Sequence, residues 1–194
     1  MNRLHHYLTS RNVYTLFLHV AVVVLAVQVV ILSNQNRTLK EGRQAKSRDQ
    51  IKEGDTLQFI QLEPLRPGPA MDTSSARQLV FLMTTTCPFC KETIPVWKEL
   101  CAKVGNSIPV LAISLDTRDS TSKFVEGNGI SFPVAISRDA AAFKKVNKIT
   151  GVPIALIREN TGRVTKVWFG KLDTQKALEV ERSALIDPVE ENLK

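Results

Sequence analysis

Hydrophobic and polar positions divide the chain into two regions of different character. The first contains an unbroken apolar run, Val13 to Leu32, of 20 residues without a formal charge. A helix of that length spans about 30 Å, the hydrocarbon thickness of a bilayer. A signal peptide has a shorter apolar core followed by a small-residue cleavage site, and a core helix is rarely apolar on every face. We therefore predict an uncleaved transmembrane anchor over residues 13–32, after a short N-terminal tail (1–12).

The pattern changes twice after this run. Residues 33–53 are polar and charged with almost no large apolar side chain, which is typical of a solvated linker. From Gly54 onward, short apolar runs alternate with segments of helical spacing. We expect one folded domain over residues 54–187 and a C-terminal tail over 188–194.

The periodicity inside this domain predicts an α/β fold. The expected helices cover 88–104, 121–128, 139–149 and 174–185. The expected strands cover 79–84, 108–114 and 131–137, followed by a hairpin of 154–158 and 164–169 with its turn near 160–162. This order of elements requires a mixed central sheet covered by helices on both faces.

Charge and histidine content exclude several function classes. Of the net charge of +7, residues 1–53 carry +5, so the domain is nearly balanced and offers no basic face for nucleic acid. All three histidines lie in the first 19 residues. The domain therefore has no Ser-His or Cys-His nucleophile pair and no Cys/His zinc site of the usual four ligands. We expect no metal site.

Two of the three cysteines form the motif Cys87-Pro88-Phe89-Cys90 between a predicted strand and a predicted helix. Unpaired N–H groups and the helix dipole at this position stabilise a thiolate and lower its pKa, so Cys87 is the predicted nucleophile. Cys90, one turn further on, is the predicted resolving thiol. Pro88 suits the first helical position, where its missing N–H costs no hydrogen bond. Such a pair exchanges disulfides without a metal or organic cofactor.

Other interpretations of the cysteines remain. The pair could be half of a metal site, for which only Cys101 offers a further soft ligand, or an inert structural disulfide. The strand–turn–helix context favours redox function. Cys101, three helical turns after Cys90, is expected to be a small buried hydrophobe, with a third redox thiol or a regulatory site as the alternative.

Longer segments around the motif resemble the thioredoxin superfamily, and within it the membrane-anchored TlpA/ResA-type oxidoreductases and the methylamine-utilisation thioredoxin-like protein. The resembling segments are EGDTLQFIQL, LVFLMTTTCPFCKETIPVWKEL and FKKVNKITGVPIALIRENTGRVTKVWFGKL. The first looks like the opening strand segment of this branch. The resemblance implies a helix kinked at Pro95 and a cis-proline at Pro153. It also implies that the Val152 backbone pairs with an extended substrate beside Pro88 and Phe89.

The chain departs from this family at two places. Thr86 stands where thioredoxins usually have Trp, and Thr93 stands where relatives commonly have an acidic residue, with Glu92 one position earlier. The usual buried proton-handling carboxylate is therefore missing or displaced, and the direction of electron flow stays open. Asp116 follows a strand end but is interpreted as a solvated loop residue. Trp97 and Trp168 are expected to pack near the site.

These observations predict a thiol–disulfide oxidoreductase that acts on disulfide-bearing proteins, with the bilayer as a partner through residues 13–32. Counting flanking Lys and Arg would place the domain in the cytoplasm, although large domains often cross regardless of such charge. Disulfide substrates occur mainly outside the cytoplasm, so we expect an extracytoplasmic, periplasmic domain. The resemblance implies a membrane thiol electron donor and a reductase role in cytochrome c or periplasmic enzyme maturation.

Two rival functions stay open. Thr84 and Cys87 have the T-x-x-C spacing of thiol peroxidases of the peroxiredoxin type, but Val80 stands where those enzymes need proline. A non-catalytic anchored binding module is the other alternative.

Overall fold

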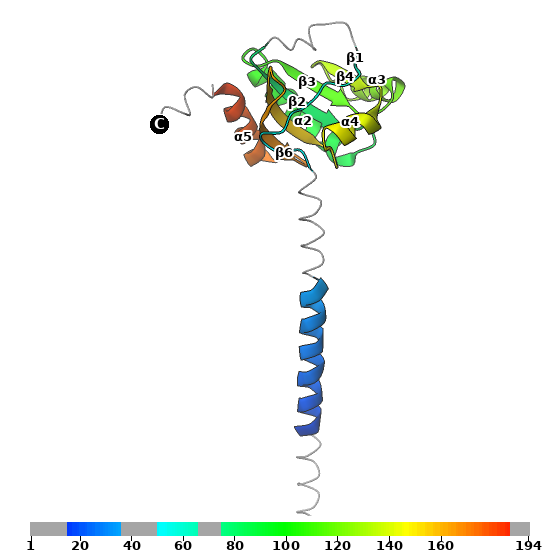
Figure 1. Cartoon of the computed structure of the whole chain (residues 1–194), viewed down its shortest axis with the longest axis vertical. Helices are drawn as coiled ribbons and strands as arrows, with labels where there is room; N and C mark the ends of the chain where they lie inside the picture. Colours follow the sequence, from blue (N-terminus) through cyan, green and yellow to red (C-terminus); the bar gives the residue numbers. More distant parts are fainter. Residues whose placement is uncertain (1–14, 36–49, 66–74, 187–194) are drawn as a thin grey trace, which may run out of the picture. The chain divides into compact units, whose positions relative to one another are not determined.

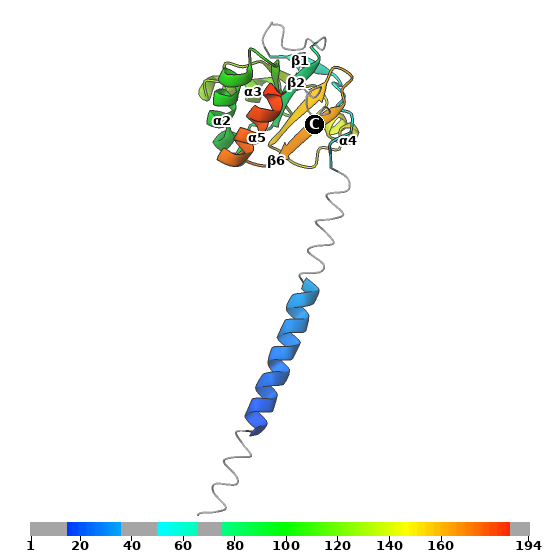
Figure 2. The same cartoon turned by 90° about the vertical axis from the view of Figure 1, so that its left-hand side faces the viewer.

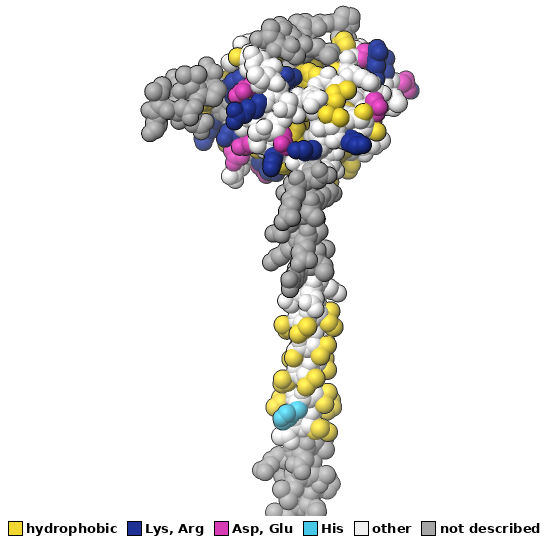
Figure 3. All heavy atoms as spheres, in the orientation of Figure 1, with side chains coloured by type: hydrophobic (Ala, Val, Ile, Leu, Met, Phe, Trp, Pro, Cys, Tyr) yellow, Lys and Arg dark blue, Asp and Glu magenta, His cyan; other side chains and the backbone are white. Residues whose placement is uncertain are grey.

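The computed structural model describes residues 15–35, 50–65 and 75–186, and the chain divides into two compact units, Met1–Asp49 and Gln50–Lys194. In the first unit, Thr15–Gln35 is a single helix that is long and apolar enough to cross a membrane. None of its most apolar window is buried, and hydrophobic side chains line the face seen in Figure 3. The helix extends three residues beyond the predicted end at Leu32. Both predicted tails and residues 36–49 of the predicted linker lie outside the described residues.

The second unit is built on a mixed sheet of six strands in the order β1-β4-β3-β2-β5-β6 (Figure 1). The central strands β2, β3 and β4 are parallel, whereas β1 and the β5–β6 hairpin run antiparallel to their neighbours. The strands are β1 (Leu62–Pro64), β2 (Arg77–Met83), β3 (Val110–Ser114), β4 (Val134–Ser137), β5 (Ile154–Glu159) and β6 (Val164–Phe169). The predicted mixed sheet is confirmed.

Helices cover both faces of the sheet, as predicted. They are α2 (Pro88–Val104), α3 (Arg118–Gly127), α4 (Ala140–Val146) and α5 (Thr174–Leu185). Alternate residues of β2 point to opposite faces: Phe81 packs with residues of α2, α3 and α5, and Leu82 packs with Phe143 of α4. Figure 2 shows α2, α3 and α5 on one side of the sheet and α4 on the other.

Local hydrogen bonds explain where two helices depart from the predicted bounds. Helix α3 begins at Arg118, three residues early, because the Thr117 hydroxyl accepts a hydrogen bond from the Ser120 N–H and caps it. Helix α4 ends at Val146, three residues early. There Lys148 adopts a left-handed conformation (φ 52°), and the Ile149 N–H bonds back to the Lys144 carbonyl as in a Schellman motif.

Residues 50–65 pack onto the sheet with little regular structure. The expected opening strand, residues 53–62, is reduced to an isolated bridge between Thr56 and Arg163, and the regular strand begins only at Leu62. Ile51, within the segment expected to be a linker, is 1% exposed, and its N–H bonds to the Lys148 carbonyl. The folded unit therefore includes residues before Gly54.

The β5–β6 hairpin has the predicted turn. Gly162 has φ +88°, and a Cβ there would lie 3.1 Å from the Leu57 carbonyl oxygen. Glycine avoids both the backbone strain and the clash. The turn lets β6 pair with β5, and β5 in turn pairs with the central strand β2.

Candidate active site

The cysteine pair lies where β2 ends and α2 begins. Cys87 is the N-cap of α2, with φ −79° and ψ 115°, and Pro88 occupies the first turn. The backbone N–H of Cys90 donates a hydrogen bond to the Cys87 sulfur at 3.3 Å. The helix therefore offers a backbone donor to the first thiol, as the sequence predicts for a helix N-terminus. Both cysteines are free thiols in the structure.

The two thiols differ in their access to solvent. Cys87 is partly exposed, whereas Cys90, on the inner face of α2, is fully buried in the core. Burial is the main cause that raises the pKa of Cys90 to about 12, and the neighbouring Cys87 and Asp116 add to the effect. Cys90 is therefore a neutral thiol at neutral pH. This asymmetry suits an accessible first thiol and a shielded second one.

The loop before β5 approaches Cys87 from the other side. The Cys87 thiol lies 3.6 Å from the carbonyl oxygen of Val152 and donates to it. The Val152–Pro153 peptide bond is cis, as the resemblance implied. Phe89, between the cysteines, is 56% exposed. The structure thus brings Cys87, Cys90 and Val152 together, with Pro88 exposed at the start of the helix.

The first turns of α2 carry no carboxylate toward the thiols. Thr93, in the position that is acidic in relatives, is fully buried, and its hydroxyl donates to the Phe89 carbonyl at 2.7 Å. Glu92 is exposed and forms an ion pair with Lys171 at 2.6 Å. Pro95 lies within the helix as predicted.

A carboxylate reaches the site from a different element. Asp116 follows β3, and one of its carboxylate oxygens accepts hydrogen bonds from both the backbone N–H and the hydroxyl of Thr85, at 2.5 Å and 2.8 Å. The interpretation of Asp116 as a solvated loop residue is therefore wrong. Its position at a strand end was the available signal, because the carboxyl ends of the parallel strands β2 and β3 meet at one edge of the sheet.

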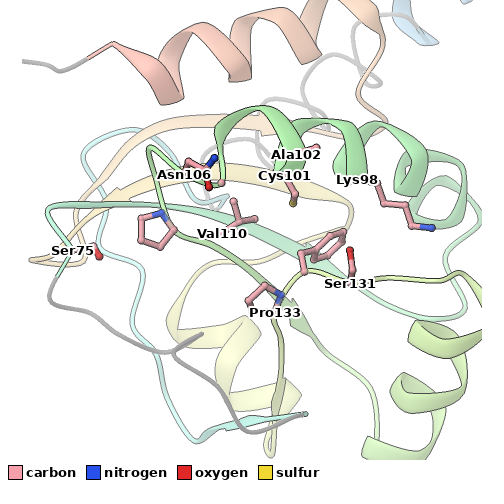
Figure 4. A pocket seen from close by; sticks show the side chains of 11 residues that line it. Ser75, Lys98, Cys101, Ala102, Asn106, Val110, Ser131 and Pro133 are labelled. Carbon is pink, nitrogen blue, oxygen red and sulfur yellow. The ribbon is translucent and has the colours of Figure 1, made fainter.

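Cys101 lies at the opposite end of α2, in a cavity of about 550 Å³ (Figure 4). Its sulfur points into this cavity, which Val110 and Phe132 also line. Burial raises the pKa of the Cys101 thiol to about 12. A partly buried, protonated thiol remote from the pair agrees with a packing role rather than with a third redox thiol.

The two tryptophans occupy different environments. Trp97 is fully buried on the inner face of α2 and stacks on Phe81 with ring centroids 4.7 Å apart. Trp168 is half-buried on the edge strand β6, and its indole N–H donates to Glu179 at 3.3 Å. Trp97 therefore supports the helix that carries the cysteines, and Trp168 joins β6 to α5.

Comparisons with known proteins agree with the fold. Residues 71–166 match the family model described as AhpC/TSA family. No curated protein sequence matches the chain.

Three solved structures illustrate the similarity. A thiol-disulfide isomerase from Corynebacterium glutamicum is 20% identical, with a TM-score of 0.57 over 69% of this chain and 97% of its own. A protein described as the thiol:disulfide interchange protein DsbE, from Chlorobium tepidum, is 21% identical, with a TM-score of 0.57 over 70% and 99%. A thioredoxin-related protein from Neisseria meningitidis is 19% identical, with a TM-score of 0.52 over 63% and 97%. At these identities the similarity shows a shared fold.

Proposed function

We propose that the chain, which has a thioredoxin-like fold, is a member of the thioredoxin superfamily and a thiol–disulfide oxidoreductase that acts through Cys87 and Cys90. One observation carries the proposal: a partly exposed sulfur at the N-cap of α2 receives the N–H of a second, fully buried cysteine one turn away. This arrangement gives one thiol access to a substrate and keeps the other for the second step.

The proposed reaction has two steps. The Cys87 thiolate attacks one sulfur of a substrate disulfide and forms a mixed disulfide, and the other substrate sulfur leaves as a thiolate. Cys90 then loses its proton, and its thiolate attacks the Cys87 sulfur, releasing the second substrate thiolate. The substrate gains two electrons, and this chain is left with a Cys87–Cys90 disulfide.

We propose that the site works as a reductase for extracytoplasmic proteins that carry disulfides. The helix Thr15–Gln35 supports attachment to a membrane, with the second unit on the outer side, where protein disulfides form. A membrane dithiol donor would then reduce the Cys87–Cys90 disulfide and restore the cycle. Maturation of cytochrome c or of periplasmic enzymes would supply suitable substrates. The cis-Pro153 loop, with the Val152 carbonyl beside Cys87, is the proposed backbone contact for an extended substrate.

Insulin reduction by dithiothreitol tests the proposed activity. The full-length chain in detergent is expected to accelerate the reaction, and Cys87→Ser is expected to abolish the acceleration. Cys101→Ser is the matched control, because its thiol lies in a separate cavity and should leave the rate unchanged. Acceleration that survives Cys87→Ser would contradict the mechanism, whereas a parent chain that gives no acceleration would favour a non-catalytic binding module.

The proposed compartment has its own test. A reporter fused after Lys194 that is active only outside the cytoplasm, such as an alkaline phosphatase, is expected to be active. A reporter active only in the cytoplasm is expected to stay silent at the same position. The reverse pattern would place the cysteine pair in the cytoplasm.

A thiol peroxidase is the second candidate, because the AhpC/TSA model matches this region and Thr84 lies three residues before Cys87. The peroxidase mechanism would oxidise Cys87 with hydrogen peroxide rather than with a protein disulfide. Stopped-flow oxidation of the reduced chain by peroxide separates the two functions. We expect slow oxidation, and fast oxidation confined to Cys87 would favour the peroxidase.

A further inference from the structure

We propose that Asp116 is a positioning residue of the cysteine site, which holds the loop before Cys87 through both hydrogen-bond donors of Thr85. The inference rests on the proposed function and deepens it, since it names a group outside the helix that controls the nucleophile. The carboxylate touches neither thiol through a hydrogen bond in the described part of the chain. It acts on Cys87 through the intervening loop.

The contact joins two segments that are far apart in the sequence. Thr85 lies in the two-residue turn between β2 and α2, two positions before Cys87. Its backbone N–H and its hydroxyl both donate to the same oxygen of Asp116, at 2.5 Å and 2.8 Å. Hydrogen bonds to a charged acceptor are stronger than neutral ones, and two donors from one residue fix its orientation. The loop that precedes Cys87 is therefore fixed by a carboxylate that follows β3.

Asp116 is itself well anchored. The backbone N–H of Leu115, the preceding residue, donates to the Met83 carbonyl at the end of β2. The Asp116 N–H lies 3.4 Å from the Ser114 hydroxyl, to which it donates, and this hydroxyl bonds to that of Thr121 at 2.8 Å. Ser114 and Thr121 are both fully buried. The carboxylate is thus connected through a buried polar pair to α3, which gives it a fixed position at the end of the sheet.

Among the described residues, the Asp116 carboxylate has hydrogen bonds with Thr85 but no ion pair. Asp116 is partly buried, and among residues 15–35, 50–65 and 75–186 no Lys or Arg forms an ion pair with it. Its charge is close enough to contribute to the raised pKa of Cys90, after burial and the effect of Cys87. An acidic side chain that served only solubility would be exposed, as Asp119 is in the next helix.

The test compares variants that remove the contact in stages, in the full-length chain in detergent. Asp116→Ala removes the acceptor, Asp116→Asn keeps an acceptor oxygen but not the charge, and Thr85→Val removes only the hydroxyl donor. Asp119→Ala is the matched control, because it removes an acidic residue of α3 whose only described partner is an exposed lysine. The measured quantity is the rate at which the Cys87 thiol reacts with a small aromatic disulfide, in a Cys101→Ser background.

The expected result is a graded loss with rescue by the conservative variant. Misplacing a reacting atom by about 1 Å can cost roughly a hundredfold, so we expect Asp116→Ala to slow the reaction by about tenfold or more. Asp116→Asn is expected to stay within about threefold of the parent rate and Thr85→Val to lie between the two, since each keeps part of the contact. Asp119→Ala should match the parent.

Two outcomes would overturn the inference. One is an Asp116→Ala rate equal to the parent rate, and the other is an Asp116→Asn rate as low as that of Asp116→Ala. Thermal unfolding of each variant separates a local effect from loss of the fold. If Asp116→Ala fails to fold, Thr85→Val decides the question: a rate below that of the parent supports the inference, and a rate equal to that of the parent overturns it. Insulin reduction by the parent tests the proposed function separately, so a parent without activity is distinguishable from an inert Asp116.

Discussion

The sulfur of Cys87 accepts a hydrogen bond from the backbone N–H of Cys90, with 3.3 Å between nitrogen and sulfur, while the Cys90 side chain is itself completely buried. The same residue thus supplies a backbone hydrogen-bond donor to the Cys87 sulfur and a thiol that burial keeps neutral. A pair built in this way separates attack from resolution. The first thiol meets the substrate, and the second reacts with the Cys87 sulfur once that sulfur is part of a mixed disulfide.

Phe89 is expected to contribute to binding of protein substrates. Its side chain is 56% exposed beside Cys87, where an apolar surface can contact an unfolded or extended chain. We expect Phe89→Ala to slow insulin reduction by roughly threefold to tenfold and to leave the reaction with a small aromatic disulfide unchanged. Leu178→Ala, at a similarly exposed apolar residue of α5, is the control. Equal losses for both disulfides would show that Phe89 acts on Cys87 itself.

Alkaline pH is expected to destabilise the fold partly through Cys101. Burial raises the pKa of this thiol to about 12, whereas an unfolded cysteine titrates near pH 8.5. Between these values the unfolded state has lost the proton that the folded state keeps. The contribution to stability is therefore complete below about pH 8.5 and is lost as the pH rises toward 12.

Urea unfolding of the reduced chain at pH 8 and pH 10 measures this effect. The midpoint is expected to fall with pH in the parent and to fall less in Cys101→Ala. The same decrease in both proteins would assign the alkaline loss to other groups, including Cys90, whose pKa is raised in the same direction.

Trp97 is expected to be a main source of stability for α2. It is fully buried and stacks on Phe81, and its indole N–H has no hydrogen-bond partner in the described part of the chain. Trp97→Ala should cost about 3–5 kcal/mol in the free energy of unfolding. Trp97→Phe should cost less than half of that, because it keeps the aromatic contact and breaks no hydrogen bond. Urea denaturation gives both values, and equal costs would contradict the role of stacking.

Ile51 is expected to stabilise the folded unit although it precedes the regular strands. It is 1% exposed and packs in the core on the α4 face. We expect Ile51→Ala to lower the free energy of unfolding by about 2–5 kcal/mol. Lys52→Ala, at an exposed neighbour, should be nearly neutral. If both variants unfold like the parent, residues 50–53 are a spacer rather than part of the domain.

The sequence predicts the helices and strands that have strong periodicity. It does not predict features that depend on a few contacts between distant segments, such as β1 and the contact of Asp116 with Thr85. Apolar runs such as 79–84 and the helical spacing of 88–104 reported burial directly, so the central strands and α2 were found. The strand β1 pairs only three residues with β4, which is too short for a period-2 pattern to identify. The position of Cys87 followed from motif and local structure together, because helix N-terminal chemistry depends only on neighbouring residues.

The place of Asp116 after a buried strand was a signal in the sequence, but its partner could not be identified from it, because that partner lies 31 residues away. A polar residue after a buried strand has the same local pattern whether it faces solvent or a neighbouring loop. The parallel register that pairs Met83 with Ser114 is what brings the two strand ends together. Such contacts between loops arise from the assembled sheet rather than from local periodicity.

Trapping of the mixed disulfide tests the central claim most directly. Reduced full-length chain carrying Cys101→Ser is mixed with a disulfide-bearing protein, quenched with acid and an alkylating agent, and separated without reductant. With Cys90→Ser added, the account predicts a stable covalent complex through Cys87, released by dithiothreitol, because no second thiol remains to resolve it. With Cys87→Ser added, it predicts no complex, because the Cys90 thiol is buried and protonated. A complex that forms with Cys87→Ser and not with Cys90→Ser would contradict the assignment of Cys87 as the attacking thiol.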